Sequence, residues 1–171
     1  DADHHLVDAG GGQPLHQRLH LDVVDLRAAL VAPPGVRGHV REALDGAPRG
    51  GWDNKPVTWV SLEDARAYAQ WAGKRLPREW EWQYAAQGND ERLYPWGNDW
   101  DEGRVPRVNR GRRLLPPADV DAHPQGASPF GVEDLVGNVW QWTDEFADEH
   151  TRAAVLRGGS SYQPQTSHWY F

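Results

Sequence analysis

The sequence predicts an α+β fold with few helices, short strands and long loops. Its 171 residues are the size of one domain. It contains ten tryptophans, each of which buries about 150–250 Å² when packed and can therefore anchor a core with little regular secondary structure. Only two segments after residue 51 have the spacing of amphipathic helices, and the stretch 89–128 is rich in proline.

The composition divides the chain near residue 50. Residues 1–50 contain no aromatic residue and no Ser, Thr or Asn, whereas every aromatic residue follows position 51. We therefore expect residues 1–50 to be an unassigned segment, either loosely ordered or not native to the domain, and residues 51–171 to form the domain. Because residue 1 is not Met, we expect the sequence to be a piece of a longer chain.

Charge and composition exclude several classes of function. The formal net charge of −7 disfavours binding to a nucleic-acid backbone, which needs clustered Lys and Arg. No run approaches the roughly twenty apolar residues of a membrane-spanning helix, so no membrane partner is expected. The chain has no cysteine, which excludes disulfides, zinc–thiolate sites, iron–sulfur clusters and a thiol nucleophile within it.

The first predicted elements are a strand and a helix. Residues 56–60 combine β-branched and aromatic side chains, which is typical of a short strand. Ser61 and Asp64 have the spacing of a capping box, in which each side chain bonds the backbone N–H of the other. Apolar residues then recur at helical spacing over residues 62–72, and Gly73 supplies a C-terminal stop.

A second helix and two further strands follow. Residues 78–86 predict a helix that closes at Gly88. Short strands are expected at residues 138–143 and 154–157.

Several conspicuous side chains are better explained by structure than by catalysis. Arg75 and Glu79 have the i, i+4 spacing of a helical ion pair. Ser160 follows two glycines, and we interpret this pattern as a tight turn that lets backbone approach the core. An acidic run is expected to form a solvated face: Asp144, Glu145, Asp148 and Glu149. Six tryptophans are expected in the core: Trp59, Trp71, Trp82, Trp96, Trp140 and Trp142.

Three sequence blocks, taken in order, carry a family resemblance. They are Pro56–Trp82 with its Trp-Ala-Gly-Lys-Arg-Leu-Pro segment, Tyr94–Asn98, and Phe130–Ser160 with Gly-Asn-Val-Trp-Gln-Trp-Thr and Arg-Gly-Gly-Ser. Together they resemble the formylglycine-generating enzyme (sulfatase-modifying factor) family, which also supplies the C-terminal domain of ergothioneine-type sulfoxide synthases. The resemblance implies an irregular fold related to C-type lectins, here expected to be incomplete at both ends.

The resemblance also implies a missing copper site. Copper-dependent members of the family use two cysteines shortly after the Gly-Gly-Ser turn, and the matching positions fall near Gln163 and His168. Neither an amide nor an imidazole replaces a pair of thiolates for soft Cu(I). We therefore expect no catalytic residue at these positions and no copper-dependent formation of formylglycine by this chain.

The segment after Gly159 is a candidate ligand-binding region, because the resemblance implies that it lines a groove. It mixes aromatic and amide side chains, a composition suited to adaptable recognition. A peptide, a protein or a small molecule would each suit such a groove. The candidate residues are Tyr162, Gln163, Gln165, His168, Trp169 and Tyr170.

A calcium site beside the Gly-Asn-Val-Trp turn is also implied by the resemblance. The matching positions are Asp134, Gly137, Val139 and Gln141, and calcium prefers such side-chain and backbone oxygens. The family commonly has Glu at the last of these positions, whereas Gln141 is neutral. Two alternatives stay open: a bound calcium ion, or a turn that amide hydrogen bonds and tryptophan packing hold without an ion.

An iron site is a further hypothesis. His16, His20 and Asp22 could form a two-histidine, one-carboxylate triad for non-haem iron, and sulfoxide synthases carry a similar pattern in a separate helical bundle. Only about 35 residues separate this motif from the family-like domain, which is too few for that bundle, so a solvent-exposed polar stretch is the simpler interpretation. The sequence thus favours a non-catalytic binding module or accessory lobe, with part of a non-haem iron oxidoreductase as the alternative.

Overall fold

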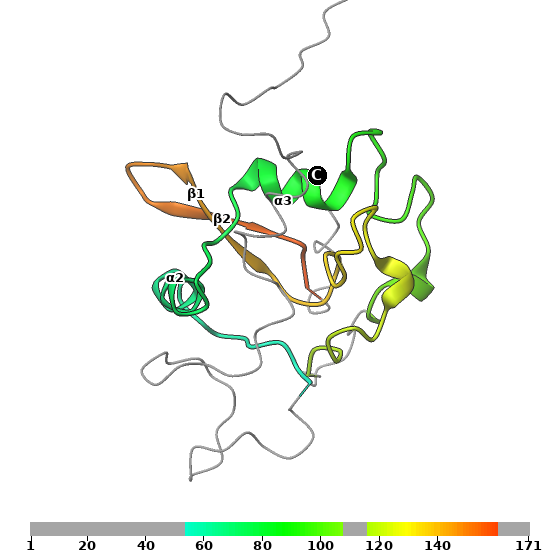
Figure 1. Ribbon diagram of the computed structural model, residues 1–171, viewed down its shortest axis with the longest axis horizontal. Coiled ribbons are helices and arrows are strands. Elements are labelled where there is room, and N and C mark those ends of the chain that lie inside the picture. The colour runs from blue at the N-terminus through cyan, green and yellow to red at the C-terminus, as the bar shows by residue number, and fades with distance from the viewer. Residues whose placement is uncertain (1–53, 108–115, 161–171) are drawn as a thin grey trace, which may run out of the picture.

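The computed structural model describes residues 54–107 and 116–160, and the segments 1–53, 108–115 and 161–171 lie outside this part (Figure 1). The described residues form two helices, two single-turn 3-10 helices and one antiparallel hairpin, joined by long loops. This mixture of helices and a small sheet confirms the predicted α+β class. The elements are α2 (Leu62–Trp71), α3 (Glu79–Gln87), η1 (Glu102–Arg104), η2 (Pro124–Gly126), β1 (Gln141–Asp148) and β2 (Ala153–Arg157).

Helix α2 begins at the predicted capping box. The Ser61 hydroxyl accepts a hydrogen bond from the Asp64 N–H at 3.1 Å, and the Asp64 carboxylate accepts one from the Ser61 N–H at 3.2 Å. At the other end, Ala72 is the C-cap and Gly73 adopts a positive φ of 66°. Glycine reaches this left-handed region without the penalty that a Cβ imposes, which is why the helix ends here.

The predicted strand at residues 56–60 is wrong. Within the described residues this segment has no strand partner and runs as irregular backbone. Trp59 adopts a left-handed φ of 62°, which interrupts the extended conformation that a strand requires. The segment is instead fixed to the hairpin by one side chain, because the Val60 carbonyl accepts a hydrogen bond from Trp142 Nε1 at 3.2 Å.

Helix α3 starts and stops within one residue of its predicted bounds. Its first turn is capped by Glu81, whose carboxylate accepts a hydrogen bond from the Arg78 N–H at 2.8 Å. Gly88 closes the helix with a φ of 73° and donates its N–H to the Tyr84 carbonyl at 2.8 Å. Local signals therefore predict the bounds of both helices closely.

Strands β1 and β2 pair antiparallel, with Gln141 opposite Arg157 and Trp142 opposite Leu156. The second strand lies at its predicted position, whereas the first begins three residues later than predicted and extends to residue 148. The three residues lost from the predicted strand follow Gly137, whose φ of 76° is left-handed, and residues 138 and 139 lie in a bend. Helices α2 and α3 both lie beside this hairpin (Figure 1).

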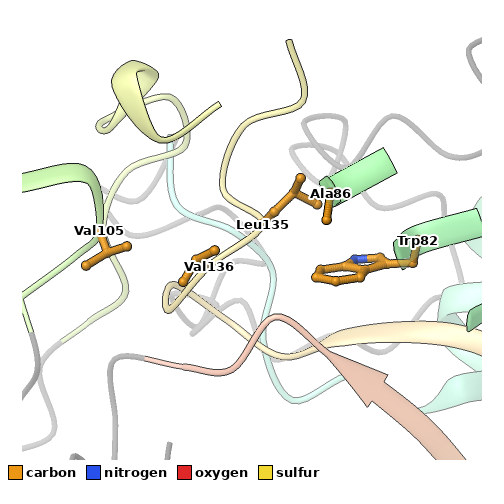
Figure 2. Packing of buried hydrophobic residues seen from close by; sticks show 5 residues of the cluster. All are labelled: Trp82, Ala86, Val105, Leu135 and Val136. Atoms are coloured by element: carbon orange, nitrogen blue, oxygen red, sulfur yellow. The ribbon is translucent and has the colours of Figure 1, made fainter. Parts of the chain in front are cut away.

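Two small cores hold these elements together. Helix α3 contributes two members of the first core cluster, whose other members come from the loops (Figure 2). The second core cluster lies between α2 and the hairpin. In it, Leu62, Ala69 and Leu76 pack against Trp142 and Phe146 of β1. The first core cluster consists of Trp82, Ala86, Val105, Leu135 and Val136.

The tryptophan predictions are confirmed only in part. Trp82 is 1% exposed, and Trp96 and Trp142 are half-buried against the two clusters. The prediction is wrong for Trp59, Trp71 and Trp140, which are 82%, 60% and 46% exposed. Residue type does not fix burial, because the side of an element that faces the core is decided by packing: next to Trp140, the polar Gln141 takes the buried position.

No helix within residues 54–107 and 116–160 combines the length and the apolar character needed to cross a membrane.

Candidate functional site

The four positions predicted to bind calcium lie in the turn at residues 134–141. This turn contains Leu135 and Val136 of the first core cluster and ends at Gln141, the first residue of β1. The backbone at Asp134 is left-handed, with a φ of 57°, and Gly137 has a φ of 76°. The Gly137 N–H donates to the Gly158 carbonyl at 2.7 Å, which fixes the turn to the end of β2. Val139 is half-buried. The turn is thus a compact part of the fold.

Gln141 bridges this turn to helix α3. Its side-chain oxygen Oε1 accepts a hydrogen bond from Trp82 Nε1 at 2.6 Å, and its side-chain nitrogen Nε2 donates to the Asp134 carbonyl at 2.8 Å. Gln141 is 7% exposed and Trp82 is 1% exposed. Both polar ends of the buried amide therefore have partners, as burial of such a group requires.

The Asp134 carboxylate is engaged on the other side of the turn. It accepts a hydrogen bond from the Asp121 N–H at 3.0 Å. Burial raises the pKa of Asp134, and the hydrogen bond from the Asp121 backbone offsets only part of that rise. Next to it, the buried Asn138 amide accepts from the Ala118 N–H at 3.0 Å and donates back to the Ala118 carbonyl at 3.4 Å.

One contact in this turn bears on the predicted calcium site. Calcium needs six to eight oxygen ligands, but the Gln141 side chain turns an N–H donor, not an oxygen, toward the Asp134 carbonyl. Across the described ranges, no group of three or more His, Asp or Glu side chains could hold a metal ion.

A second polar cluster lies at the start of α3. Arg75 donates from Nη1 and Nη2 to the two carboxylate oxygens of Glu81, both at 2.6 Å. The predicted pair of Arg75 with Glu79 is wrong: the Glu79 carboxylate pairs with Arg157 of β2, because the hairpin lies against this end of α3. Burial by itself would raise the pKa of Glu81, but the bonds from Arg75 and from the Arg78 N–H lower it overall.

The acidic run on β1 is only partly a solvated face. Asp144, Asp148 and Glu149 are exposed, as predicted, although Asp144 forms an ion pair with Arg66 of α2. Glu145 departs from the prediction, since it is half-buried and its carboxylate accepts a hydrogen bond from the α3 backbone at 2.9 Å. The run therefore holds both helices to the hairpin.

Sequence reasoning missed an aromatic cluster. Tyr94 stacks on Trp96 with ring centroids 5.4 Å apart and an interplanar angle of 9°, and Trp100 meets both rings within 6 Å. Trp100 is 47% exposed, so one side of this cluster faces solvent. The signal was the Tyr-Pro-Trp-Gly block, in which Tyr94 and Gly97 exchange two backbone hydrogen bonds and so bring the rings together.

The remaining candidates lie at or beyond the edge of the described part. Gly158 confirms the predicted close approach, because a Cβ there would lie 3.0 Å from the Leu135 carbonyl oxygen. The predicted iron ligands His16, His20 and Asp22 lie outside the described residues. So do the ligand-binding candidates Tyr162, Gln163, Gln165, His168, Trp169 and Tyr170, and with them Gln163 and His168 as the predicted neighbours of the family's cysteine positions.

Comparison with known proteins agrees with the sequence blocks. Residues 34–169 match the sulfatase-modifying factor enzyme 1-like domain. The chain is 39% identical to the inactive C-alpha-formylglycine-generating enzyme 2 of Bos taurus over 148 residues, which cover 78% of this chain and 44% of that protein.

Two further relatives carry other names. The chain is 42% identical to the formylglycine-generating enzyme of Mus musculus over 110 residues, or 57% of this chain and 29% of that protein. It is 45% identical to the hercynine oxygenase of Mycobacterium tuberculosis over 94 residues, or 53% of this chain and 22% of that protein. The chain thus spans less than half the length of these relatives. It belongs to the sulfatase-modifying factor (formylglycine-generating enzyme) family.

Proposed function

We propose that this chain is a binding or accessory lobe of a sulfatase-modifying-factor-type protein, without copper–thiolate chemistry of its own. The observation that carries the proposal is a match to the family's domain over residues 34–169 in a chain that contains no cysteine. Soft Cu(I) requires a pair of thiolates, and only cysteine side chains supply thiolates. One relative bears the name of an inactive formylglycine-generating enzyme, which is consistent with a non-catalytic member.

Exposed tryptophans support a role in contacts. Five of the eight tryptophans in the described ranges are 46–82% exposed. Large exposed apolar side chains favour contact with another surface, because their burial gains roughly 25 cal/mol per Å². Since the chain covers less than half of its relatives, the rest of a longer protein is one such surface. These tryptophans are Trp59, Trp71, Trp80, Trp100 and Trp140.

We propose that the ligand is a peptide bound after Gly159, in a C-type-lectin-like arrangement. The support is local: Gly158 packs against Leu135 and Gln141, so the backbone just before the candidate segment is fixed against the core. The same segment supplies the aromatic and amide side chains expected of an adaptable peptide groove.

A labelled sulfatase-derived cysteine peptide tests both parts of this proposal. We expect saturable binding by fluorescence anisotropy and, after incubation with Cu(I) and oxygen, no formylglycine by mass spectrometry. Trp169→Ala should weaken binding by about tenfold, whereas Leu93→Ala, at an exposed apolar side chain outside the tryptophan set, should leave it unchanged. Formation of formylglycine would overturn the non-catalytic role, and absence of binding would overturn the peptide groove.

The alternative is part of a non-haem iron oxidoreductase, and one observation favours it. The chain reaches 45% identity with a hercynine oxygenase. His16, His20 and Asp22 would then hold iron. Iron measured by elemental analysis in the intact protein separates the two functions: one iron per chain, lost in His16→Ala/His20→Ala but kept in His4→Ala/His5→Ala, would support the oxidoreductase. Its absence after reconstitution with Fe(II) would support the binding lobe.

A further inference from the structure

We infer that the Gln141 amide takes the place of a calcium ion in the turn at residues 134–141, so that this turn folds independently of metal. The inference decides between the two alternatives that the sequence leaves open, and it does not rest on the proposed function. It depends on the direction of two hydrogen bonds, on the engagement of the neighbouring polar groups and on the packing around the amide.

The orientation of the amide is fixed by its partners. The indole N–H of Trp82 can only donate, so the atom 2.6 Å from it must be the Gln141 oxygen. The amide nitrogen then necessarily faces the Asp134 carbonyl, 2.8 Å away, and that carbonyl can only accept. A flipped amide would set two donors against each other on one side and two acceptors on the other.

The donor in this position takes the place that a cation would occupy at the Asp134 carbonyl. A calcium ion bridging residues 134 and 141 would need oxygen from both, yet here a polar N–H points at the Asp134 carbonyl and satisfies it directly. The N–H carries a partial positive charge and therefore stabilises the partial negative charge of the Asp134 carbonyl oxygen, as a cation would. A Glu at position 141 could accept from Trp82 in the same way but would turn a second oxygen toward the carbonyl.

Two neighbouring acceptors are already engaged. The Asp134 carboxylate accepts from the Asp121 backbone at 3.0 Å, and the Asn138 amide oxygen accepts from the Ala118 backbone at 3.0 Å. Binding an ion with these groups would therefore break existing hydrogen bonds in addition to turning the Gln141 amide.

Packing closes the space beside the amide. A Cβ on Gly158 would lie 3.5 Å from both Cδ and Nε2 of Gln141 and 3.0 Å from the Leu135 carbonyl oxygen. The backbone at Gly158 therefore lies against the Gln141 amide. With Gln141 only 7% exposed, the amide is held between the β2 end and α3.

Thermal unfolding of the full chain in chelator and in millimolar Ca²⁺ tests the inference. We expect the Tm of the unmodified protein to be the same in both. Gln141→Glu should lower the Tm in chelator by roughly 5 °C, because two oxygens then face each other, and Ca²⁺ but not Mg²⁺ should restore it.

Gln87→Glu is the matched control. Gln87 also donates its amide to a backbone carbonyl, that of Arg92 at 2.8 Å, and also accepts through Oε1, from Gln83 at 2.6 Å. It lies outside the turn, so its Glu variant should lose stability without recovering it in Ca²⁺.

Each result has a defined meaning. A saturable rise in the Tm of the unmodified protein with Ca²⁺, or stoichiometric Ca²⁺ binding by calorimetry, would overturn the inference. A folded Gln141→Glu variant that ignores Ca²⁺ would also overturn it, because the amide would then not be what replaces the ion. If that variant folds only in Ca²⁺ the inference is supported, and if it folds in neither buffer the titration of the unmodified protein decides.

Discussion

Arg75 donates hydrogen bonds from both terminal nitrogens to the Glu81 carboxylate, at 2.6 Å each. These two bonds connect the loop before α3 to the first turn of the helix. The same carboxylate accepts the Arg78 N–H and so caps the helix. One buried side chain thus combines an ion pair with a helix cap, and the loop and helix depend on it together.

Glu81→Gln should lower the free energy of unfolding by about 2 kcal/mol at pH 7, because it removes charge-assisted hydrogen bonds. The pKa of Glu81 is lowered in the fold from its ordinary value of 4.5. Its stabilising contribution is therefore present above that value and is lost as the pH falls through the lowered pKa. Urea unfolding of both proteins should show a difference that is constant above pH 5.5 and closes in acid.

Glu149→Gln is the control for this pH dependence, since Glu149 is exposed in the turn between β1 and β2. It should leave the stability unchanged at every pH. A difference between the unmodified protein and Glu81→Gln that persists undiminished to pH 2 would contradict the role of the carboxylate charge.

Trp82→Phe should destabilise the protein by about 2–4 kcal/mol in urea unfolding. The substitution removes the N–H that satisfies Gln141, and it leaves a void in the first core cluster. Trp80→Phe, on the same helix but 50% exposed, should change stability by less than about 0.5 kcal/mol. Equal effects of the two substitutions would show that the buried bridge to Gln141 contributes nothing.

Gly158→Ala should destabilise more than Gly131→Ala. Both glycines have positive φ, 90° and 74°, so each Ala incurs roughly 1–2 kcal/mol of backbone strain. Only at Gly158 would the new Cβ also meet the Leu135 carbonyl oxygen, at 3.0 Å, while nothing lies within 4 Å of it at Gly131. We expect about 1–3 kcal/mol more for Gly158→Ala by thermal or urea unfolding, and equal losses would rule out this contact as a constraint.

Ser61→Ala should cost about 1 kcal/mol, because it removes one half of the capping box of α2. Ser61→Thr keeps a hydroxyl at the N-cap and should lose only a few tenths of that. Unfolding monitored by circular dichroism measures both. A Thr variant as unstable as the Ala variant would mean that the hydroxyl does not cap the helix.

Helices α2 and α3 could be predicted closely because their signals are local. In α2, a serine precedes an acidic residue by three positions, and in α3 Glu81 caps the backbone of Arg78 in the same way. These caps and the closing glycines act within one or two turns, so neighbours in the chain suffice to predict the ends. The strand expected at residues 56–60 lacked such support. A strand needs extended backbone that can pair with a neighbour, and the left-handed backbone at Trp59 interrupts that extended conformation.

The candidate site was predicted as a set of positions but not as a set of contacts. The turn at residues 134–141 could be located from its Gly-Asn-Val-Trp motif, yet the pairing of Gln141 with Trp82 joins residues 59 positions apart. Likewise, i, i+4 spacing indicated Arg75 with Glu79, whereas β2 brought Arg157 to Glu79 and left Arg75 to Glu81. Spacing of i, i+4 brings side chains together only within a helix, whereas Arg75 lies in the loop before α3, which begins at Glu79.

The sequence by itself determined the family, the absence of a thiolate in this chain and the ends of both helices, since these follow from residue types and near neighbours. Only the tertiary structure decided which tryptophans are buried, which carboxylate each arginine meets and which way the Gln141 amide points. Those outcomes depend on how distant segments pack, because burial and hydrogen-bond direction are properties of the whole surrounding surface and not of one side chain.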